Sequence, residues 1–259
     1  HVGTRVVTGP ELRDEGFRMT LDLEPGNYRF VAYGGMACGK SSFSMVRTPE
    51  SGCKYSDVRA KMDVDCLTNP DRKKLHDMYW GQLTLATADL YQEGVVEMMK
   101  NTNNIRIMLQ QMNGDPVDDK DFDFEITDDN TLFACDNDLI PNGVETYTPW
   151  ARGQASTGVM EGSKEVIEAY AEFSTSRLML KNSPKLVIRR KGGEEVVNIP
   201  LNNYLLLFRS EFHKDMDKQE FLDRRSEWSM LFFLDEDHTW LKTKIKINDW
   251  TVRINDAEI

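Results

Sequence analysis

The stretch from Phe17 to Gly35 constrains the fold most, because it has the pattern of two β-strands joined by a turn. Apolar and polar residues alternate from Phe17 to Leu23, as in a strand with one buried face. Pro25-Gly26-Asn27 supplies residues that favour a tight turn, and the apolar run Tyr28 to Tyr33 follows it. The pattern predicts an antiparallel hairpin, which argues against a parallel α/β enzyme.

Strand patterns recur through most of the chain. Every second residue is apolar from Ile105 to Leu109 and from Phe122 to Ile126. Turns that join neighbouring strands are predicted at Gly192-Gly193 and at Asn248-Asp249. The recurrence of short strands indicates a β-rich fold.

Helical patterns are brief by comparison. Asn69, followed by Pro70, is expected to start one helix, and Asp217 is expected to cap another over the segment KQEFLDRR. The stretch 150–164 is small, polar and glycine-bearing, as linkers between domains commonly are. The sequence therefore predicts an all-β fold of two tandem β-sandwich domains, residues 1–150 and 151–259, with short helical insertions.

Length and charge restrict the function classes. The 259 residues suffice for one large domain or two smaller ones. The formal charge of -11 would repel a phosphate backbone, so nucleic acid is not an expected partner. No apolar run approaches the ~18 residues of a membrane-spanning helix. The chain starts at His1 with neither an initiator methionine nor a signal peptide, so we expect a processed or trimmed form.

Four cysteines allow several interpretations. Cys38, Cys53, Cys66 and Cys135 do not form a Cys-x-x-Cys motif, which disfavours a zinc site. In an oxidising compartment a disulfide between Cys38 and Cys53 would constrain a long loop between strands. The alternative is four reduced thiols that pack as small apolar groups.

One motif points to nucleotide chemistry. Residues 34–41 match the P-loop pattern in full, with Gly34, Gly39, Lys40 and Ser41 at the required positions. In a P-loop the backbone amides hold phosphates, the lysine reaches the β- and γ-phosphates, and the serine binds magnesium. The apolar run Leu231 to Leu234 ends at Asp235, as does the strand that holds the metal in such enzymes.

The surrounding sequence opposes this interpretation. A P-loop needs a helix that starts at its Lys-Ser pair, but Thr48-Pro49 and Ser51-Gly52 interrupt the chain within two turns of Ser41. The preceding strand is also predicted to belong to an antiparallel hairpin. The alternative interpretation is a glycine-bearing loop that leaves the edge of a sheet.

No other cluster predicts a catalytic, cofactor or metal site. The acidic stretch Asp115 to Asp129 lacks EF-hand spacing, and a solvated strand face explains it better than calcium does. The four histidines are scattered, and no nucleophile lies beside a base. Most of the tryptophans are expected in the core rather than on a sugar-binding platform: Trp80, Trp150, Trp228, Trp240 and Trp250.

Several segments together resemble a known family. They are LDLEPGNYRFVAYGG, then VVEMMKNTNNIRIMLQQMNG with FDFEITDDN and a segment ending Thr146-Tyr147-Thr148-Pro149, then DKQEFLDRRSEWSMLFFLDE, and finally IKINDWTVRIN. Their order from about residue 17 to 255 is similar to that of the FimB-like minor or anchor subunits of Bacteroidales type V pili.

The resemblance implies two transthyretin-like β-sandwiches and no enzymatic activity or cofactor. It also implies a lipoprotein of the outer membrane and cell surface, located in the fimbrium and tethered through an N-terminal lipidated cysteine, which this chain lacks. The implied partners are other fimbrial subunits, joined by donation of a β-strand into a neighbour's groove.

We therefore expect a non-enzymatic anchor or accessory subunit of a surface fimbria that assembles by strand complementation. One alternative is a tip adhesin or glycan-binding surface lipoprotein, which should show an exposed aromatic cluster on a loop. Another alternative is a P-loop NTPase that uses residues 34–41.

Overall fold

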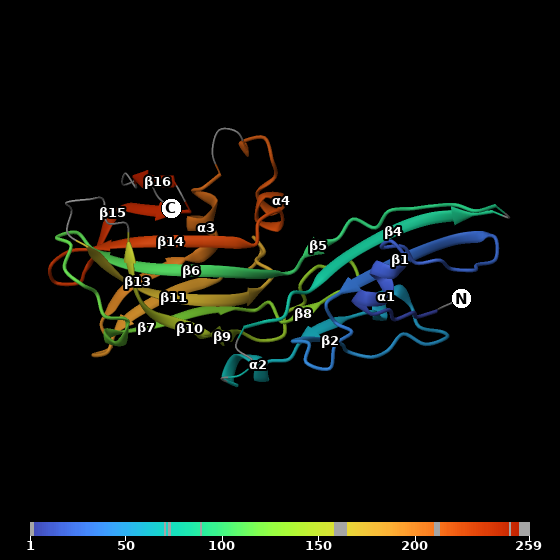
Figure 1. Ribbon diagram of the computed structural model, residues 1–259, viewed down its shortest axis with the longest axis horizontal. Coiled ribbons are helices and arrows are strands. Elements are labelled where there is room, and N and C mark those ends of the chain that lie inside the picture. Colours follow the sequence, from blue (N-terminus) through green and yellow to red (C-terminus); the bar gives the residue numbers. More distant parts are fainter. Residues whose placement is uncertain are drawn as a thin grey trace.

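The computed structural model describes residues 3–69, 71, 74–88, 90–157, 165–209, 213–248 and 250–253. The molecule is elongated, with two larger sheets at one end and two three-stranded sheets at the other (Figure 1). The protein is mainly β with a few short helices, as predicted. The helices are α1 Gly9–Asp14, α2 Asp65–Thr68, α3 Leu201–Leu206 and α4 Lys218–Asp223, with short 3-10 turns η1 Tyr55–Asp57 and η2 Asp119–Asp121.

The larger end contains a six-stranded and a four-stranded sheet. The first has the order β10 Ala151–Thr157, β11 Val166–Ser176, β6 Thr102–Gln111, β14 Glu227–Leu234, β15 Trp240–Ile247 and β16 Trp250–Arg253. The second has the order β13 Glu195–Pro200, β12 Lys185–Arg190, β7 Phe122–Asp128 and β9 Glu145–Tyr147. All pairs are antiparallel except β14 and β6, which run parallel.

The predicted alternation of β6 and β7 is confirmed. Ile105, Ile107 and Leu109 on β6 are completely buried. On β7, Phe122 and Phe124 are at most 2% exposed, and Ile126 is completely buried. These side chains belong to one apolar core cluster, which extends from the two larger sheets to β2, β3 and β8 of the smaller end. The predicted turn at Gly192-Gly193 is confirmed, because Gly193, with φ 89°, lies between β12 and β13. Of the turn predicted at Asn248-Asp249, Asn248 lies between β15 and β16, while Asp249 lies outside the described residues.

The smaller end contains the sheets β1-β4-β5 and β2-β3-β8. Their strands are β1 Gly26–Gly34, β4 Tyr79–Thr87 and β5 Met99–Lys100, and β2 Phe43–Met45, β3 Ala60–Met62 and β8 Leu132–Phe133. All nine residues of β1 pair with β4, from Gly26 opposite Thr87 to Gly34 opposite Tyr79. Below, the β1-β4-β5 sheet is called the N-terminal sheet.

The predicted hairpin between residues 17–23 and 28–33 is wrong. The second segment forms β1, but the first is not a strand, and Phe17 is 75% exposed. β4 takes up the full length of β1 on one side, and residues 17–24 lead into β1 without turning back along it. Alternation thus identified a strand-like segment but not its pairing.

The division predicted at residue 150 does not separate the sheets. β6 and β7 precede residue 150, yet they pair with β11, β14 and β12, which follow it. Residues 151–157, expected in a linker, form the edge strand β10, and residues 158–164 lie outside the described part of the chain. A polar sequence suits an edge strand because one of its sides faces solvent.

One helix prediction is confirmed and one is wrong. The Asp217 carboxylate caps α4 by accepting from the backbone N–H groups of Gln219 and Glu220, at 2.8 and 3.2 Å. Asn69 instead follows the last residue of α2, and residues 75–78 are not helical. The apolar side chains there, Leu75 and Met78, are buried in the core next to the start of β4 rather than along a helix face. Pro70 lies outside the described residues.

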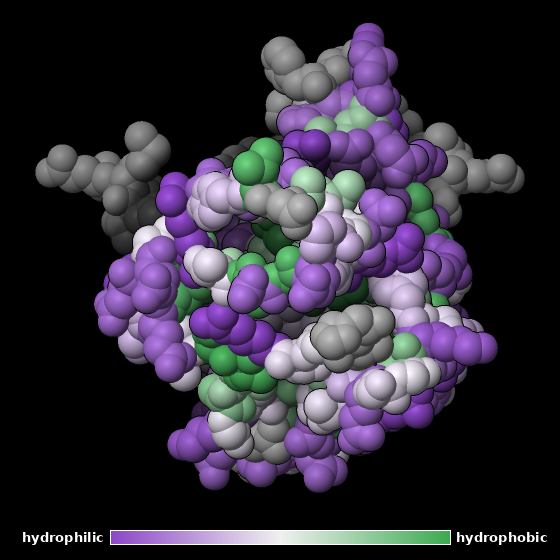
Figure 2. All heavy atoms as spheres, turned by 90° about the vertical axis from the view of Figure 1, so that its right-hand side faces the viewer, coloured by the Kyte–Doolittle hydropathy of each residue, from purple (hydrophilic) through white to green (hydrophobic). Residues whose placement is uncertain are grey.

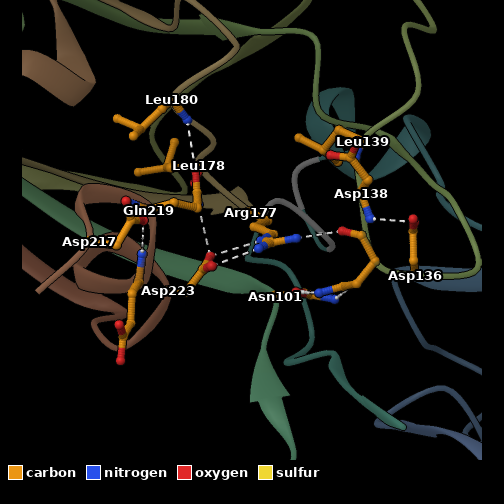
Figure 3. A network of polar contacts seen from close by, with 12 residues as sticks. Asn101, Asp136, Asp138, Leu139, Arg177, Leu178, Leu180, Asp217, Gln219 and Asp223 are labelled. Carbon is orange, nitrogen blue, oxygen red and sulfur yellow. Dashed lines mark hydrogen bonds and ion pairs between the residues drawn. The ribbon is translucent and has the colours of Figure 1, made fainter.

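A polar network ties together segments from both ends of the molecule (Figure 3). Arg177, just after β11, donates from Nε and Nη2 to the two carboxylate oxygens of Asp223 on α4, at 2.8 and 2.6 Å. Its Nη1 donates to the carbonyl of Asn137 in the loop that follows β8. The amide groups of Asn137 and Asn101 exchange two hydrogen bonds of 2.6 and 3.0 Å directly before β6. The network therefore fixes how these segments meet.

Candidate functional site

The P-loop-like residues 34–41 lie in the connection between β1 and β2, which belong to two different sheets. Gly34 ends β1, and the Ser41 hydroxyl donates to the carbonyl of Gly35 at 2.9 Å. The N–H of Phe43 donates to Ser41 Oγ at 3.2 Å, and β2 starts there. The loop therefore lacks the helix N-terminus that a P-loop uses to hold phosphate. Asp235 lies in the distant six-stranded part, where its carboxylate accepts from the Thr239 N–H at 2.8 Å.

We expect Lys40→Ala and Gly39→Ala to leave the protein unchanged in a thermal melt with millimolar Mg-ATP. Lys40 is exposed, and a Cβ added at Gly39 would meet no atom within 4 Å. A bound nucleotide would raise the melting temperature of the wild-type chain. Stabilisation that the Lys40 substitution abolishes would contradict this expectation.

The cysteines are free thiols in the structure. Cys38 is exposed in the loop after β1, and Cys53 lies near Arg47, with its Sγ 3.6 Å from a guanidinium nitrogen. Cys66 is buried and behaves as a small apolar group. The predicted Cys38–Cys53 bridge is thus not formed here, and it stays a prediction for oxidising conditions.

The acidic face of β7 is balanced by cations on and just after the neighbouring strand β12 rather than only solvated. Glu125 forms an ion pair with Arg189 at 2.7 Å, and Asp123 forms one with Lys191. In the described part of the chain no group of three metal-binding side chains occurs. Trp228 and Trp240 are buried, as expected, while Trp150 is 37% exposed with the Lys74 ammonium 4.8 Å from its ring centroid.

The N-terminal sheet has two different faces. On one face the Arg29 guanidinium lies 4.4 Å from the ring centroid of Tyr55, whose hydroxyl donates to Gln82 and to the carbonyl of Cys135. The pKa of Tyr33 on the same face is raised to about 12, mainly by burial and to a smaller extent by the neighbouring Cys135 and Tyr55. This face is therefore packed only at its end near Tyr33, while Arg29, Gln82 and Thr84 remain exposed.

The other face is apolar but poorly covered. Tyr28 lies opposite Leu85 and Phe30 opposite Leu83, so the four side chains share this face. Each is only half-buried, whereas the inward residues of β6 are completely buried. Apolar groups also reach the surface at this end of the molecule, between polar ones (Figure 2). The most exposed of them in this region are Phe17, Leu90, Tyr91 and Val95, each at least 75% exposed.

The edges of the N-terminal sheet are unpaired over most of their length. Among the described residues, β1 pairs only with β4, and β4 pairs with β5 only at Tyr79 and Trp80. On the β5 side only Met99 and Lys100 pair with β4. Sequence reasoning therefore missed this open sheet, because a pattern of apolar residues does not report which strand edges stay free.

Two aromatic side chains lie exposed near this end. Phe17 is 75% exposed and Tyr91 is 77% exposed. Their segments are joined by an ion pair of 3.5 Å between Arg18 and Glu93, and the Tyr91 hydroxyl donates to Glu93 at 2.7 Å. This is the kind of aromatic surface that the adhesin alternative predicts.

Comparisons with known proteins agree with one another. A family model for the fimbrillin-A associated anchor proteins Mfa1 and Mfa2 matches residues 2–256. A candidate adhesin from Bacteroides thetaiotaomicron VPI-5482 is 65% identical, with a TM-score of 0.93 over 98% of this chain and 86% of that one. A candidate polysaccharide-binding protein from the same species is 26% identical, with a TM-score of 0.78 over 96% and 83% of the two chains. No curated protein matches the chain.

The fimbrial anchor protein Mfa2 of Porphyromonas gingivalis has the same fold at 12% identity, with a TM-score of 0.59 over 89% of this chain and 78% of that one. In the described residues, no helix has the length and apolar character needed to span a membrane. The family match covers nearly the entire chain and confirms the resemblance found in the sequence. The chain therefore belongs to the Mfa2 family of fimbrial anchor proteins, which are non-enzymatic components of the cell-surface fimbrium and associate with fimbrillin subunits.

Proposed function

We propose that this protein holds a neighbouring fimbrial subunit by accepting one of its β-strands on the N-terminal sheet. In this proposal the two ends of the molecule are transthyretin-like sandwiches in tandem. An N-terminal lipid outside this sequence attaches the protein to the outer membrane, in line with the resemblance described above.

The observation that carries the proposal is the open, half-covered N-terminal sheet. A strand edge with unpaired N–H and C=O groups is a template for another chain. In strand addition, backbone hydrogen bonds supply affinity, and alternate side chains enter pockets beside the edge. Phe30 and Leu83 lie on the half-covered face where those side chains would pack.

A second candidate function is adhesion to a host or glycan surface. The exposed pair Phe17 and Tyr91 favours it, because aromatic rings at a loop surface stack on sugars and on partner side chains. The close relative from Bacteroides thetaiotaomicron is itself described as a candidate adhesin. Both functions use the same end of the molecule.

The test is deletion of the gene in its host, followed by complementation and electron microscopy of fimbriae on cells and in the medium. Deletion should release long fibres into the medium, and the wild-type gene should return them to the cells. A Phe30→Ser, Leu83→Ser double variant should reach the surface but fail to retain fibres. Thr84→Ser, on the opposite face of the same strand, is the control and should restore retention.

Two results would contradict the proposal. Fibres that stay attached after deletion would reject an anchoring role, and normal fibres with lost adhesion would favour the adhesin instead. Full retention by the Phe30→Ser, Leu83→Ser variant would remove the N-terminal sheet as the acceptor.

A further inference from the structure

The chain returns from the far end of β4 along an extended segment, Leu90–Met98, called the strap. It runs beside β4 from the tip of the sheet back to β5 (Figure 1). Residues 91–98 form no backbone–backbone hydrogen bond with any other described residue. Val95 is 80% exposed, and so is Leu90. No backbone ladder therefore holds the strap, which is kept in place by the Arg18–Glu93 ion pair and by packing on β4.

The strap packs directly against Gly81 of β4, where there is no room for a side chain. A Cβ built at Gly81 would lie 2.4 Å from the carbonyl oxygen of Glu97 and 2.7 Å from Cγ1 of Val96. The next nearest atom, at 2.9 Å, is the sulfur of Met98, so all three belong to the strap. Gly81 serves this close approach rather than a turn, because its φ is not in the left-handed region. A side chain there must move the strap backbone.

A second glycine of the strap makes a weaker contact of the same kind. A Cβ at Gly94 would lie 2.5 Å from Cδ2 of Leu83, and the next atoms are 3.6 and 3.7 Å away on the same side chain. A leucine methyl can rotate away, whereas the Glu97 carbonyl cannot move without its chain. The two glycines therefore form a matched pair, in which only Gly81 controls the position of the strap.

The strap also has the composition of a strand. Val95 and Val96 are β-branched and two methionines follow Glu97, a combination that suits a half-buried sheet position. The neighbouring edge of β4, from Gln82 to Thr87, is nevertheless unpaired among the described residues. Proteins commonly cover such edges to prevent unwanted pairing. The strap packs over Gly81 and Leu83 beside this edge, without a backbone hydrogen bond to it, so its removal breaks no backbone ladder.

We propose that the strap is a displaceable cover and that the incoming strand of a fimbrial subunit pairs with β4 between Gln82 and Thr87 in its place. This proposal rests on the strand-accepting function proposed above and names the edge that is used. The incoming strand gains the hydrogen bonds that the strap does not make. Its alternate side chains meet Leu83 and Leu85 on the half-covered face.

The experiment measures binding of purified fimbrillin from the same strain to the full-length chain. Gly81→Ala lifts the strap and enlarges the fraction of molecules with an open edge, so the association rate should rise about three- to tenfold. Val96→Ser weakens the strap contact without altering β4 and should act in the same direction. Gly94→Ala, which displaces only a leucine methyl, should bind like the wild type.

Hydrogen exchange on the complex identifies the edge. Residues 82–87 of β4 should gain protection, while residues 91–98 should stay unprotected. Protection of the strap together with β4, protection on β1 alone, or equal rates for Gly81→Ala and Gly94→Ala would overturn the displaceable strap. If neither the wild type nor any variant bound fimbrillin, the proposed strand-accepting function itself would fail, and this inference with it.

Discussion

Replacing Arg177 with methionine should lower the free energy of unfolding by about 3–5 kcal/mol. The side chains of Arg177 and Asp223 are only 11% and 14% exposed, and the pair is bidentate. Removing the guanidinium leaves the Asp223 carboxylate with one neutral donor, the Gln219 amide at 3.0 Å. It also leaves the carbonyl of Asn137 without this donor. Urea denaturation followed by tryptophan fluorescence measures the loss.

Two further variants separate burial from simple loss of charge. The double variant Arg177→Met, Asp223→Leu removes both charges and should recover most of the stability, because a buried ion pair adds little over apolar groups of similar volume. Arg224→Met breaks an exposed pair with Glu220, whose side chains are 66% and 46% exposed, and should cost less than about 1 kcal/mol. Equal losses for Arg177→Met and Arg224→Met would show that the network in Figure 3 contributes no more to stability than an exposed ion pair does.

Asp128→Asn should stabilise the protein at neutral pH. Asp128 is 3% exposed, and burial, helped by the charge of Asp129, raises the pKa of its carboxyl to about 6. Its Oδ1 accepts from the N–H of Asp129 and from the Asn182 amide, and an asparagine keeps that oxygen. Its Oδ2 has no hydrogen-bond partner among the described residues, so the buried charge is poorly compensated. Removing the charge should raise the unfolding free energy by about 1–3 kcal/mol above pH 6.

The stability difference between the wild type and Asp128→Asn should depend on pH in a defined direction. The folded chain keeps the Asp128 proton up to pH about 6, whereas an unfolded aspartate loses it near the ordinary value of 3.8. Between these values the folded state binds more protons, so wild-type stability falls as pH rises relative to Asp128→Asn. Melting temperatures of the two proteins should coincide near pH 3.5 and differ by several degrees at pH 7.5. A difference that is constant across this range would contradict the assignment.

The sequence predicted individual strands better than their partners. β6 and β7 were correct because one face of each is completely buried, and burial imposes the period of two that the residues display. Residues 17–23 display the same period, yet they remain outside the sheets. Alternation reports that a segment suits a sheet, but pairing depends on distant residues that the pattern does not name. The parallel pairing of β14 with β6 and the edge position of residues 151–157 were missed for that reason.

The same limit of local sequence patterns applies to the candidate site. Residues 34–41 match a phosphate-binding motif letter by letter, but the helix and parallel strands that give the motif its chemistry are absent around them in the described structure. The family resemblance was confirmed because it used the order of many segments along the chain. The strap was not predictable, since it depends on a close approach of two backbones at Gly81, and a glycine in sequence does not reveal what approaches it.

The central position of β6 affects how the chain is made. Both of its neighbours, β11 and β14, are synthesised after it, and Asn104 meets its partner Glu227 only 123 residues later. On a growing chain the side chains of β6 therefore cannot be fully covered until almost the complete sequence has been made. Long-range pairing of this kind is slow. A nascent or truncated chain that stops before β14 presents an apolar strand with one bare side, which favours association with other chains. The topology thus leaves one side of β6 open to other chains until β14 has been made.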